Sequence, residues 1–316
     1  MAKSAEVLER PTASGVRELD DSSVGLQRRA TLIVTIVPFV GFLVAVVSLW
    51  GRGISVADLG IFLVFYAFTG LGVTVGFHRL FTHRSFKTTT TVKLLLAIAG
   101  SMAIQGPLVR WVANHRRHHA FADKEGDPHS PHLDEGPGLA GIARGLWHSH
   151  IGWLFDYEES APERWAPDLL KDPQLRRIDR QFPLWVAVSF IAPAVVGLVV
   201  TASWQGALSA FLWGSLVRIF FLHHVTWSVN SICHFYGKRP FETTDYSTNN
   251  WLLSIVSFGE SWHNNHHAFP SSAVHGIRKG QFDISAQTIS LLEKLGVAKG
   301  VKRVPADRQI RKLRDE

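Results

Sequence analysis

Residues 31–50 read TLIVTIVPFVGFLVAVVSLW, an apolar run without a charged side chain. A helix needs about 20 predominantly apolar residues to cross a bilayer, so this run predicts a transmembrane helix. Three further runs of this kind lie at about 54–76, 182–202 and 206–229. The chain has 316 residues, of which 46% are hydrophobic, and its mean hydropathy is +0.09. We therefore predict an all-α membrane protein with four transmembrane helices and a sizeable part in water.

A fifth apolar stretch, 91–109, is interrupted by Lys93, Gln105 and Pro107. We expect it to lie at the membrane interface or beneath the functional site, and not to span. The polar region 116–180 contains turn signals such as Asp127-Pro128, which predicts a cytosolic cap of short helices. The expected organisation is a disordered cytosolic tail over 1–30, a membrane domain over 31–280, and an amphipathic helix with a basic cytosolic tail over 281–316.

The net charge is +7, and most basic residues near the predicted spans lie at the ends away from the two predicted outer turns. The two predicted outer turns, near 51–57 and 203–206, hold only Arg52 among basic residues. By the positive-inside rule, both termini are then cytoplasmic. Since the positive charge follows membrane topology, it argues against nucleic-acid binding. The other basic residues near the spans are Arg28, Arg29, Arg79, Arg84, Lys87, Lys238 and Arg239.

Three histidine clusters stand at the polar ends of apolar stretches. They read HRLFTH at 78–83, HRRHH at 115–119 and HNNHH at 263–267. With four spans, all three lie on the cytoplasmic side and can converge. Eight imidazoles in such clusters predict a metal centre. The single cysteine, Cys233, excludes an internal disulfide or a thiolate cluster, and we interpret it as a small buried hydrophobe.

Helix geometry divides the histidines of each HxxHH motif. Positions i and i+4 share a helix face, whereas i+3 diverges from i+4 by about 100°. His115 and His119 should therefore face one ion and His118 another, and His263 pairs with His267 while His266 points elsewhere. Two such motifs imply two metal ions. Asn230 and His234 share a face at the end of the fourth span, so we expect them to complete the site.

Imidazole suits zinc, copper, iron and nickel alike, so the ligands alone do not identify the metal. The soluble ferritin-like pattern needs two Glu-x-x-His pairs, and this chain offers only Glu260–His263. An all-histidine site with two metals at a membrane face points to oxygen chemistry on a lipid.

The motifs resemble those of the membrane fatty-acid desaturases, specifically the bacterial Δ9 acyl-CoA (stearoyl-CoA-like) branch. The matching segments are HRLFTHRSF (78–86), WVANHRRHH (111–119), NSICHFYGKRPF (230–241) and GESWHNNHHAFP (259–270). The resemblance implies two iron ions, and an O2-dependent reaction that gives a cis double bond in a saturated acyl chain. It assigns one iron to His78, His83, His115, His119 and His266, and the other to His118, His234, His263 and His267, with Asn230 acting through water.

Several further residues are candidates to support this site. Asp123, Asp127 and Glu260 are candidates to accept hydrogen bonds from ligand imidazoles, and a solvated acidic turn is the alternative for the two aspartates. Arg218, inside the fourth span, needs a polar partner in the interior. By resemblance, Phe62 and Tyr66 occupy the closed end of a substrate tunnel. Trp227 is a tunnel-lining candidate, with a plain interfacial or core role as the alternative.

The acyl carrier is left open between CoA, a carrier protein and a membrane lipid. Where animal relatives carry a basic stretch for CoA phosphates, residues 156–159 read DYEE, which weakens the case for CoA. No haem domain lies in this sequence, so the expected electron donor is a separate ferredoxin or flavin reductase. The pattern is most like bacterial members, which implies the plasma membrane. The alternatives are a two-iron lipid hydroxylase of the same superfamily and, from another class, a histidine-rich metal transporter.

Overall fold

The computed structural model describes residues 15–133, 136–156 and 158–314. Four helices in this part of the chain are long and apolar enough to cross a membrane, over Ser23–Trp50, Val56–Thr82, Phe182–Thr201 and Trp204–His234. The predicted all-α membrane fold with four spans is therefore confirmed. The first span belongs to α1 (Asp21–Arg52), and the second joins α2 (Val56–Leu71) to the π-helical η1 (Gly72–Thr82).

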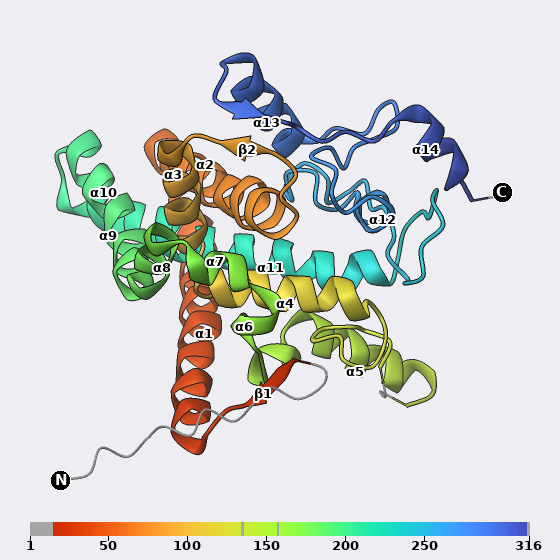
Figure 1. The fold of residues 1–316 in the computed structure, drawn as a ribbon. Coiled ribbons are helices and arrows are strands. Elements are labelled where there is room, and N and C mark those ends of the chain that lie inside the picture. Colours follow the sequence, from red (N-terminus) through yellow and green to blue (C-terminus); the bar gives the residue numbers. More distant parts are fainter. Residues whose placement is uncertain (1–14, 134–135, 157, 315–316) are drawn as a thin grey trace, which may run out of the picture.

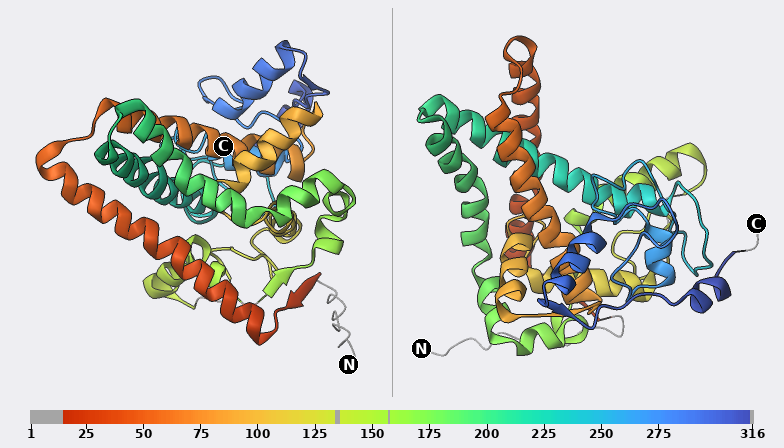
Figure 2. Two further views of the ribbon diagram at one scale, coloured as in Figure 1. Left: turned by 90° about the vertical axis from the view of Figure 1, so that its left-hand side faces the viewer. Right: turned by 90° about the horizontal axis from the view of Figure 1, so that it is seen from above.

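The third span is α9 (Phe182–Thr201). The fourth span is one continuous helix, Trp204–His234. It consists of α10 (Trp204–Ala210), π-helical η3 (Phe211–Val217), α11 (Arg218–Ser231) and the short η4 (Ile232–His234). The α1–α2 and α9–α10 turns point to one end of the molecule, whereas α13 and α14 lie towards the other (Figure 2). The four spans thus form two hairpins that carry the remaining helices on one side.

The N-terminal part departs from the prediction. Residues 15–30 are structured: β1 (Val16–Glu18) pairs with β3 (Glu158–Ser160), and α1 begins at Asp21. Asp20 caps this helix by accepting a hydrogen bond from the Ser23 amide, so polar residues extend the first span. The prediction of a disordered tail over 1–30 is wrong for this stretch, and residues 1–14 lie outside the described part.

Short helices pack at the end of the bundle opposite the two hairpin turns. The apolar stretch 91–109 does not span: Pro107 separates α3 (Thr90–Ser101) from α4 (Leu108–Phe121). Figure 1 shows α12, α13 and α14 above α11, with α4 and α5 below it. The remaining elements are β2 (Lys87–Thr88), α5 (Gly138–His150), η2 (Gly152–Phe155), α6 (Pro162–Trp165), α7 (Pro167–Lys171), α8 (Pro173–Arg180), α12 (His263–Ala268), α13 (Ile284–Lys294), β4 (Ala298–Lys299) and α14 (Ala306–Arg311).

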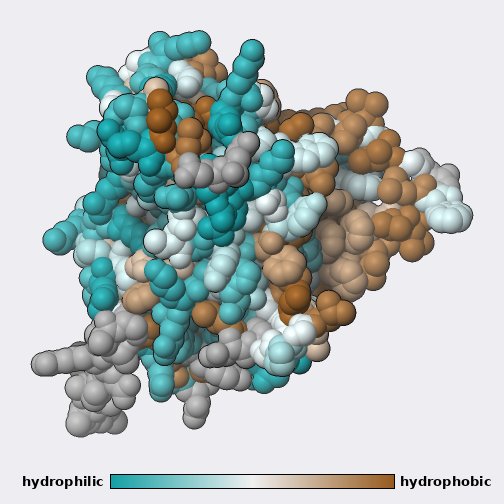
Figure 3. Space-filling model, turned by 90° about the vertical axis from the view of Figure 1, so that its right-hand side faces the viewer, coloured by the Kyte–Doolittle hydropathy of each residue, from teal (hydrophilic) through white to brown (hydrophobic). Residues whose placement is uncertain are grey.

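The surface has two characters. In Figure 3 apolar side chains gather over one side of the face shown and hydrophilic side chains over the other. The spans expose large apolar residues such as Ile33, Val47 and Val199. Because monomeric soluble proteins rarely expose apolar patches of this extent, this surface is the one that faces lipid.

Close helix packing fixes η1, which carries the first histidine cluster. A Cβ added at Gly72 would lie 2.2 Å from the backbone nitrogen of Gly100 in α3, so the two backbones are in direct contact. Phe77 of η1 packs with Leu108 and Val112 of α4 in the main buried cluster. The second span and α4 are thereby held in one rigid arrangement.

Candidate metal centre

The first pair of histidines lies on a π-helical turn. The His83 amide donates to the His78 carbonyl at 3.1 Å, a bond between residues i and i+5. The HxxxxH spacing of five therefore matches the hydrogen-bond step of η1, and the two rings lie 4.8 Å apart between centroids. π-helical turns occur frequently at functional sites. The sequence motif contained this spacing, but the π-helix itself was not predicted.

The second motif lies on α4 and divides as its helical phase predicts. The Nε2 atoms of His115 and His119 are 3.1 Å apart and point to one place. The neighbouring His118 points to another, where its Nε2 lies 3.4 Å from Nε2 of His267. One helix thus contributes imidazoles to two different clusters.

The third motif lies on α12 and faces both clusters. The Nε2 atom of His266 is 3.1 Å from that of His78 and 2.9 Å from that of His119. On the other side, Nε2 of His263 lies 2.9 Å from Nε2 of His234, which η4 places at the end of the fourth span. The two HxxHH helices therefore face each other across the site.

Nine imidazoles form two groups in which the ligand atoms of each group lie within 4.8 Å of one another. A neutral imidazole donates one hydrogen bond, so nitrogen lone pairs that converge in this way repel one another unless a cation lies among them. Each group can hold a metal ion. The first group is His78, His83, His115, His119 and His266, and the second is His118, His234, His263 and His267.

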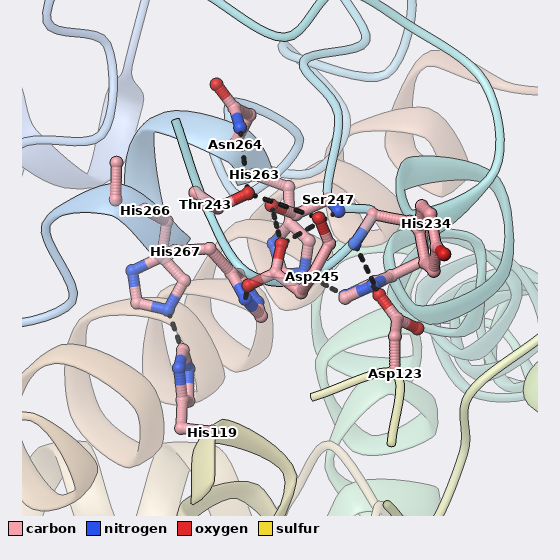
Figure 4. A network of polar contacts seen from close by, with 12 residues as sticks. His119, Asp123, His234, Thr243, Asp245, Ser247, His263, Asn264, His266 and His267 are labelled. Atoms are coloured by element: carbon pink, nitrogen blue, oxygen red, sulfur yellow. Dashed lines mark hydrogen bonds and ion pairs between the residues drawn. The ribbon is translucent and has the colours of Figure 1, made fainter. Parts of the chain in front are cut away.

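Carboxylates bind the opposite ring nitrogens. Nδ1 of His118 lies 3.0 Å from Asp127, and Nδ1 of His234 lies 2.8 Å from Asp123. The Nδ1 atom of His267 lies 2.8 Å from Asp245 (Figure 4). When Nδ1–H donates to a carboxylate, Nε2 keeps its lone pair and is fixed in direction, which is the usual arrangement around a metal-binding histidine.

The first group has one such contact, from His78 to Glu260. Glu260 also pairs with the buried Arg79 at 3.0 Å, and Arg79 is 3.0 Å from Asp283. His275 lies beside this network, with its Nδ1 3.2 Å from an Arg79 nitrogen. Asp245, Asp283 and His275 are not among the residues that the sequence predicts for the site.

The electrostatics of the site favour the neutral form of most of its imidazoles, whereas burial of His118 is outweighed by nearby carboxylates, Asp127 first, which raise its pKa. Burial, reinforced by the neighbouring histidines, lowers the pKa of His83, His115 and His119 well below the usual value. Burial is the largest single influence and acts to raise the pKa of Asp245, but the hydrogen bond and charge of His267, together with hydrogen bonds from Ser247, outweigh it and hold that pKa below the usual range. Since only neutral imidazole binds a metal, the site is ready to bind one near neutral pH.

An apolar crevice of about 50 Å³ adjoins both groups. Its walls come from η1, α4, α11 and residues 256–260, and it touches the site through His78, His115 and His263. Asn230 lines this crevice on α11, one turn before His234. The apolar lining residues are Val73, Trp111, Leu222, Val225, Val229, Val256 and Phe258.

The three predicted tunnel residues lie outside the lining set of this crevice. Tyr66 contacts two residues that line the crevice: its ring stacks on Phe258, and its hydroxyl donates to the Val256 carbonyl at 2.8 Å. Phe62 stacks on Tyr66 in turn. Trp227 is buried against His150, His223 and His224. Among the described residues, these contacts are those of a core side chain and not of a residue that lines the crevice.

Arg218 does not support the histidines. Its guanidinium is fully buried in the fourth span and donates to the carbonyl oxygens of Gly214, Met102 and Ser189. It does have the polar interior partners that an intramembrane arginine requires. These partners are backbone carbonyls from the fourth span and from other parts of the chain, and none belongs to a histidine of the metal centre. The prediction that Arg218 supports the metal ligands is therefore wrong.

A second opening reaches the site from the polar side. A pocket of about 840 Å³ includes His119 and His267 in its wall. Its lining includes two acidic residues, Glu242 and Asp245, and four basic ones, Lys124, Arg239, Lys312 and Arg314. The metal centre therefore lies between an apolar crevice and a polar, basic pocket.

Comparison with known proteins places these features in a family. A model of the fatty acid desaturase family matches residues 54–281. The chain is 42% identical over 284 residues to hex-5-enoyl-[acyl-carrier protein] acetylenase of Moorena producens, covering 90% of this chain and 88% of that protein. It is 38% identical over 251 residues to sn-1 stearoyl-lipid 9-desaturase of Anabaena variabilis (78% and 85% covered). It is 41% identical over 256 residues to acyl-CoA 5-desaturase AL21 of Anemone leveillei (79% and 73% covered).

Proposed function

The chain belongs to the fatty acid desaturase family, and we propose that it introduces a cis double bond at C9–C10 of a saturated long-chain acyl group. It is a membrane oxidoreductase of lipid metabolism. The observation that carries the proposal is the position of the apolar crevice, whose wall includes imidazoles from both histidine groups. A 9-desaturase among the relatives supports the position of the double bond.

The reaction requires O2 and external electrons. One acyl segment –CH2–CH2–, one O2, two electrons and two protons give –CH=CH– and two molecules of water. The acyl chain loses two electrons with its two hydrogens, and the donor supplies the other two that reduce O2. A hydroxylase would leave one oxygen atom in its product and release one molecule of water. Product analysis therefore distinguishes desaturation from hydroxylation.

Two iron ions fit the donor set, as neutral nitrogen ligands suit iron as well as zinc or copper. The first would be held by His78, His83, His115, His119 and His266, and the second by His118, His234, His263 and His267, with Asn230 nearby through water. Bound iron would supply the O2 activation that removes hydrogen from an unactivated C–H bond, chemistry that side chains alone lack. The family supports iron over the other metals.

The protein's own contribution is orientation and exclusion of water. Val225 and Val229 of α11, opposite Val73 of η1, offer apolar contacts that align methylene groups beside the histidines. Asp123, Asp127 and Asp245 each hold an Nδ1 proton and thereby fix a ring. The crevice is far smaller than the roughly 300–1,000 Å³ of ligand pockets, so an acyl chain enters by displacing its walls.

The basic pocket on the other side suits the electron donor. His119 and His267, one from each group, form part of its wall. An acidic ferredoxin or a flavin reductase that docks on its basic side chains would deliver electrons without crossing the acyl crevice. Water and protons reach the site by the same polar route.

The substrate carrier and the membrane complete the proposal. The relatives' names include an acyl-carrier-protein, an acyl-lipid and an acyl-CoA enzyme, so the family leaves the carrier open. The acidic stretch 156–159 argues against CoA in this chain. The distribution of basic residues supports an orientation with both termini and the metal centre in the cytoplasm. The likeness to bacterial members supports the plasma membrane as the location.

Fatty-acid analysis of a desaturase-deficient host tests the function. The host would express this chain with a compatible reductase, beside His118→Ala and the control His148→Ala, which alters a histidine outside both groups. A C9–C10 cis-monoene is expected with the wild type and the control, and none with His118→Ala. Hydroxy acids, or no lipid change in a host that supports a known relative, would contradict the proposal.

A further inference from the structure

The loop that precedes the third histidine motif carries no charge over fourteen residues. From Tyr246 to Gly259 the sequence reads YSTNNWLLSIVSFG, with no acidic, basic or histidine side chain. Three apolar side chains on it are strongly exposed: Trp251 at 71%, Leu252 at 65% and Ile255 at 63%. A contiguous exposed apolar patch of this kind marks an interaction surface. We call residues 251–256 the apolar loop.

The backbone of the apolar loop satisfies much of its own hydrogen bonding. The Asn250 side chain accepts the amides of Leu252 and Leu253. The Ser257 amide donates to the Leu253 carbonyl at 2.9 Å, and the Gly259 amide donates to the Ser254 carbonyl at 2.8 Å. Backbone polar groups that reach the apolar part of a membrane must be hydrogen-bonded within the protein, because no water is available there. These bonds meet that requirement for part of the exposed stretch.

The apolar loop is attached to a membrane span. Tyr66 of α2 donates from its hydroxyl to the Val256 carbonyl at 2.8 Å and stacks on Phe258 at 5.6 Å between ring centroids. The same helix exposes Leu63 and Val64, which face lipid. The loop is therefore bonded directly to a membrane span that has an exposed apolar face.

The apolar loop also forms a wall of the acyl crevice. Val256 of the loop and Phe258, two residues after it, line the crevice together with Val225 and Val229 of the fourth span. A segment that exposes Trp251 and Ile255 on its outside and lines the crevice on its inside separates the bilayer from the metal centre by one layer of chain.

We propose that residues 251–256 insert into the membrane interface and admit the acyl chain of a membrane lipid sideways into the crevice. Trp251 is the anchor, because tryptophan is favoured at the level of the headgroups, and Leu252 and Ile255 lie towards the acyl region. The absence of charge from this stretch disfavours an acidic carrier protein as its partner. This inference rests on the proposed function and narrows its substrate to a lipid-linked acyl group.

Position-specific labelling tests the insertion without requiring activity. The variants Trp251→Cys and Ile255→Cys would carry a maleimide fluorophore, and Lys279→Cys, at an exposed charged position, serves as control. The natural Cys233 is buried and does not react. In vesicles of phosphatidylcholine and phosphatidylglycerol, brominated acyl chains should quench the labels at 251 and 255 and leave the label at 279 unquenched. Equal, weak quenching at all three positions would overturn the proposal.

A double variant tests the entry route. Trp251→Ser with Ile255→Ser should lower the conversion of lipid-linked acyl chains in vesicles about tenfold, since roughly 1.4 kcal/mol of lost insertion energy corresponds to that factor. The same variant should convert a detergent-solubilised substrate at the wild-type rate. Leu295→Ser with Ile310→Ser, two equally exposed apolar residues at 66% and 67%, is the matched control and should leave both rates unchanged.

The outcomes separate the two proposals. An equal fall with both substrates, or no fall with either, would overturn entry through the apolar loop while desaturation stands. Quenching of the labels at 251 and 255, combined with a wild-type protein that desaturates no substrate, would contradict the proposed function and leave the insertion intact.

Discussion

The Nδ1 atom of His118 lies 3.0 Å from both carboxylate oxygens of Asp127, and the two side chains are 1% and 0% exposed. Asp127 also accepts the amides of Asp123 and His129, so the carboxylate is fixed before it orients the ring. The result is an Nε2 atom that points at the second histidine group. The same relationship joins His234 to Asp123 and His267 to Asp245.

Asp127→Asn should weaken metal binding while preserving the fold, because the amide keeps the size of the side chain and loses its charge. Loss of such a partner typically lowers metal affinity about 10–100-fold. Competition with a chelator at limiting iron measures this. Asp307→Asn, in an exposed ion pair on α14, is the control. Equal iron affinity in both variants would show that the carboxylate does not support the site.

Gly72→Ala should destabilise the protein, because its new methyl group would lie 2.2 Å from the Gly100 nitrogen and force α3 away from η1. Overpacking of this kind costs about 1–3 kcal/mol. Gly60→Ala, where nothing lies within 4 Å of the added Cβ, should leave the free energy of unfolding equal or higher. Denaturant unfolding in mixed micelles compares the two, and indistinguishable midpoints would argue against direct backbone contact.

Arg79→Met should lower the free energy of unfolding more than the same substitution at the exposed Arg84. Removing one partner of a buried ion pair costs about 3–5 kcal/mol, because Glu260 and Asp283 are left buried and unpaired. Arg84→Met breaks a pair whose arginine side chain is 62% exposed and should cost about 0–1 kcal/mol. Thermal unfolding of the metal-free proteins measures both. A loss no greater for Arg79 than for Arg84 would mean that the buried network contributes little.

The metal-free protein should lose stability on mild acidification. Burial, partly opposed by Asp245, lowers the pKa of His267 to about 4, and burial lowers the pKa of His129 to about 3. In an unfolded chain both are near 6.5. Above about pH 6.5 these imidazoles are neutral in both states, whereas below it the unfolded chain binds protons that the folded protein does not. The free energy of unfolding therefore falls as the pH drops.

Unfolding midpoints of the metal-free protein at about pH 7.5, 6.5, 5.5 and 5.0, from about 1 unit above to about 1.5 units below the unfolded histidine pKa, test this directly. A steady decrease is expected below pH 6.5. His129→Gln removes one of the depressed groups and should make the decrease shallower. A midpoint that stays constant or rises on acidification would contradict the assignment of these histidines as buried and neutral.

The sequence predicted what depends on regular helices. Apolar length alone located four spans, and the 100° step of a helix separated His118 from His115 and His119, which the structure places in different groups. Asp123 and Asp127 follow the second motif within nine residues of His118. This short separation in sequence made them candidates to bind ligand imidazoles. Each does contact a histidine of the second group.

Partners that come from irregular chain could not be predicted in this way. Asp245 lies in a loop, 22 residues before His267, where no periodicity fixes the direction of a side chain. His275 and Asp283 meet Arg79 only because the chain folds back after α12. The order of residues 15–30 depends on pairing with β3, some 140 residues away along the chain. The apolar loop is uncharged in the sequence, yet only its exposure distinguishes it from a buried segment.

The metal content of the active protein tests the central claim most directly. Purified protein loaded with iron without oxygen, freed of excess metal and assayed for desaturation, would be analysed by elemental mass spectrometry beside His83→Ala and His118→Ala, one variant for each histidine group. We expect two iron ions per chain in the fully active wild type, and fewer than two iron ions with no desaturation in each variant. Full desaturation with one iron per chain, or with another metal in both positions, would contradict this claim.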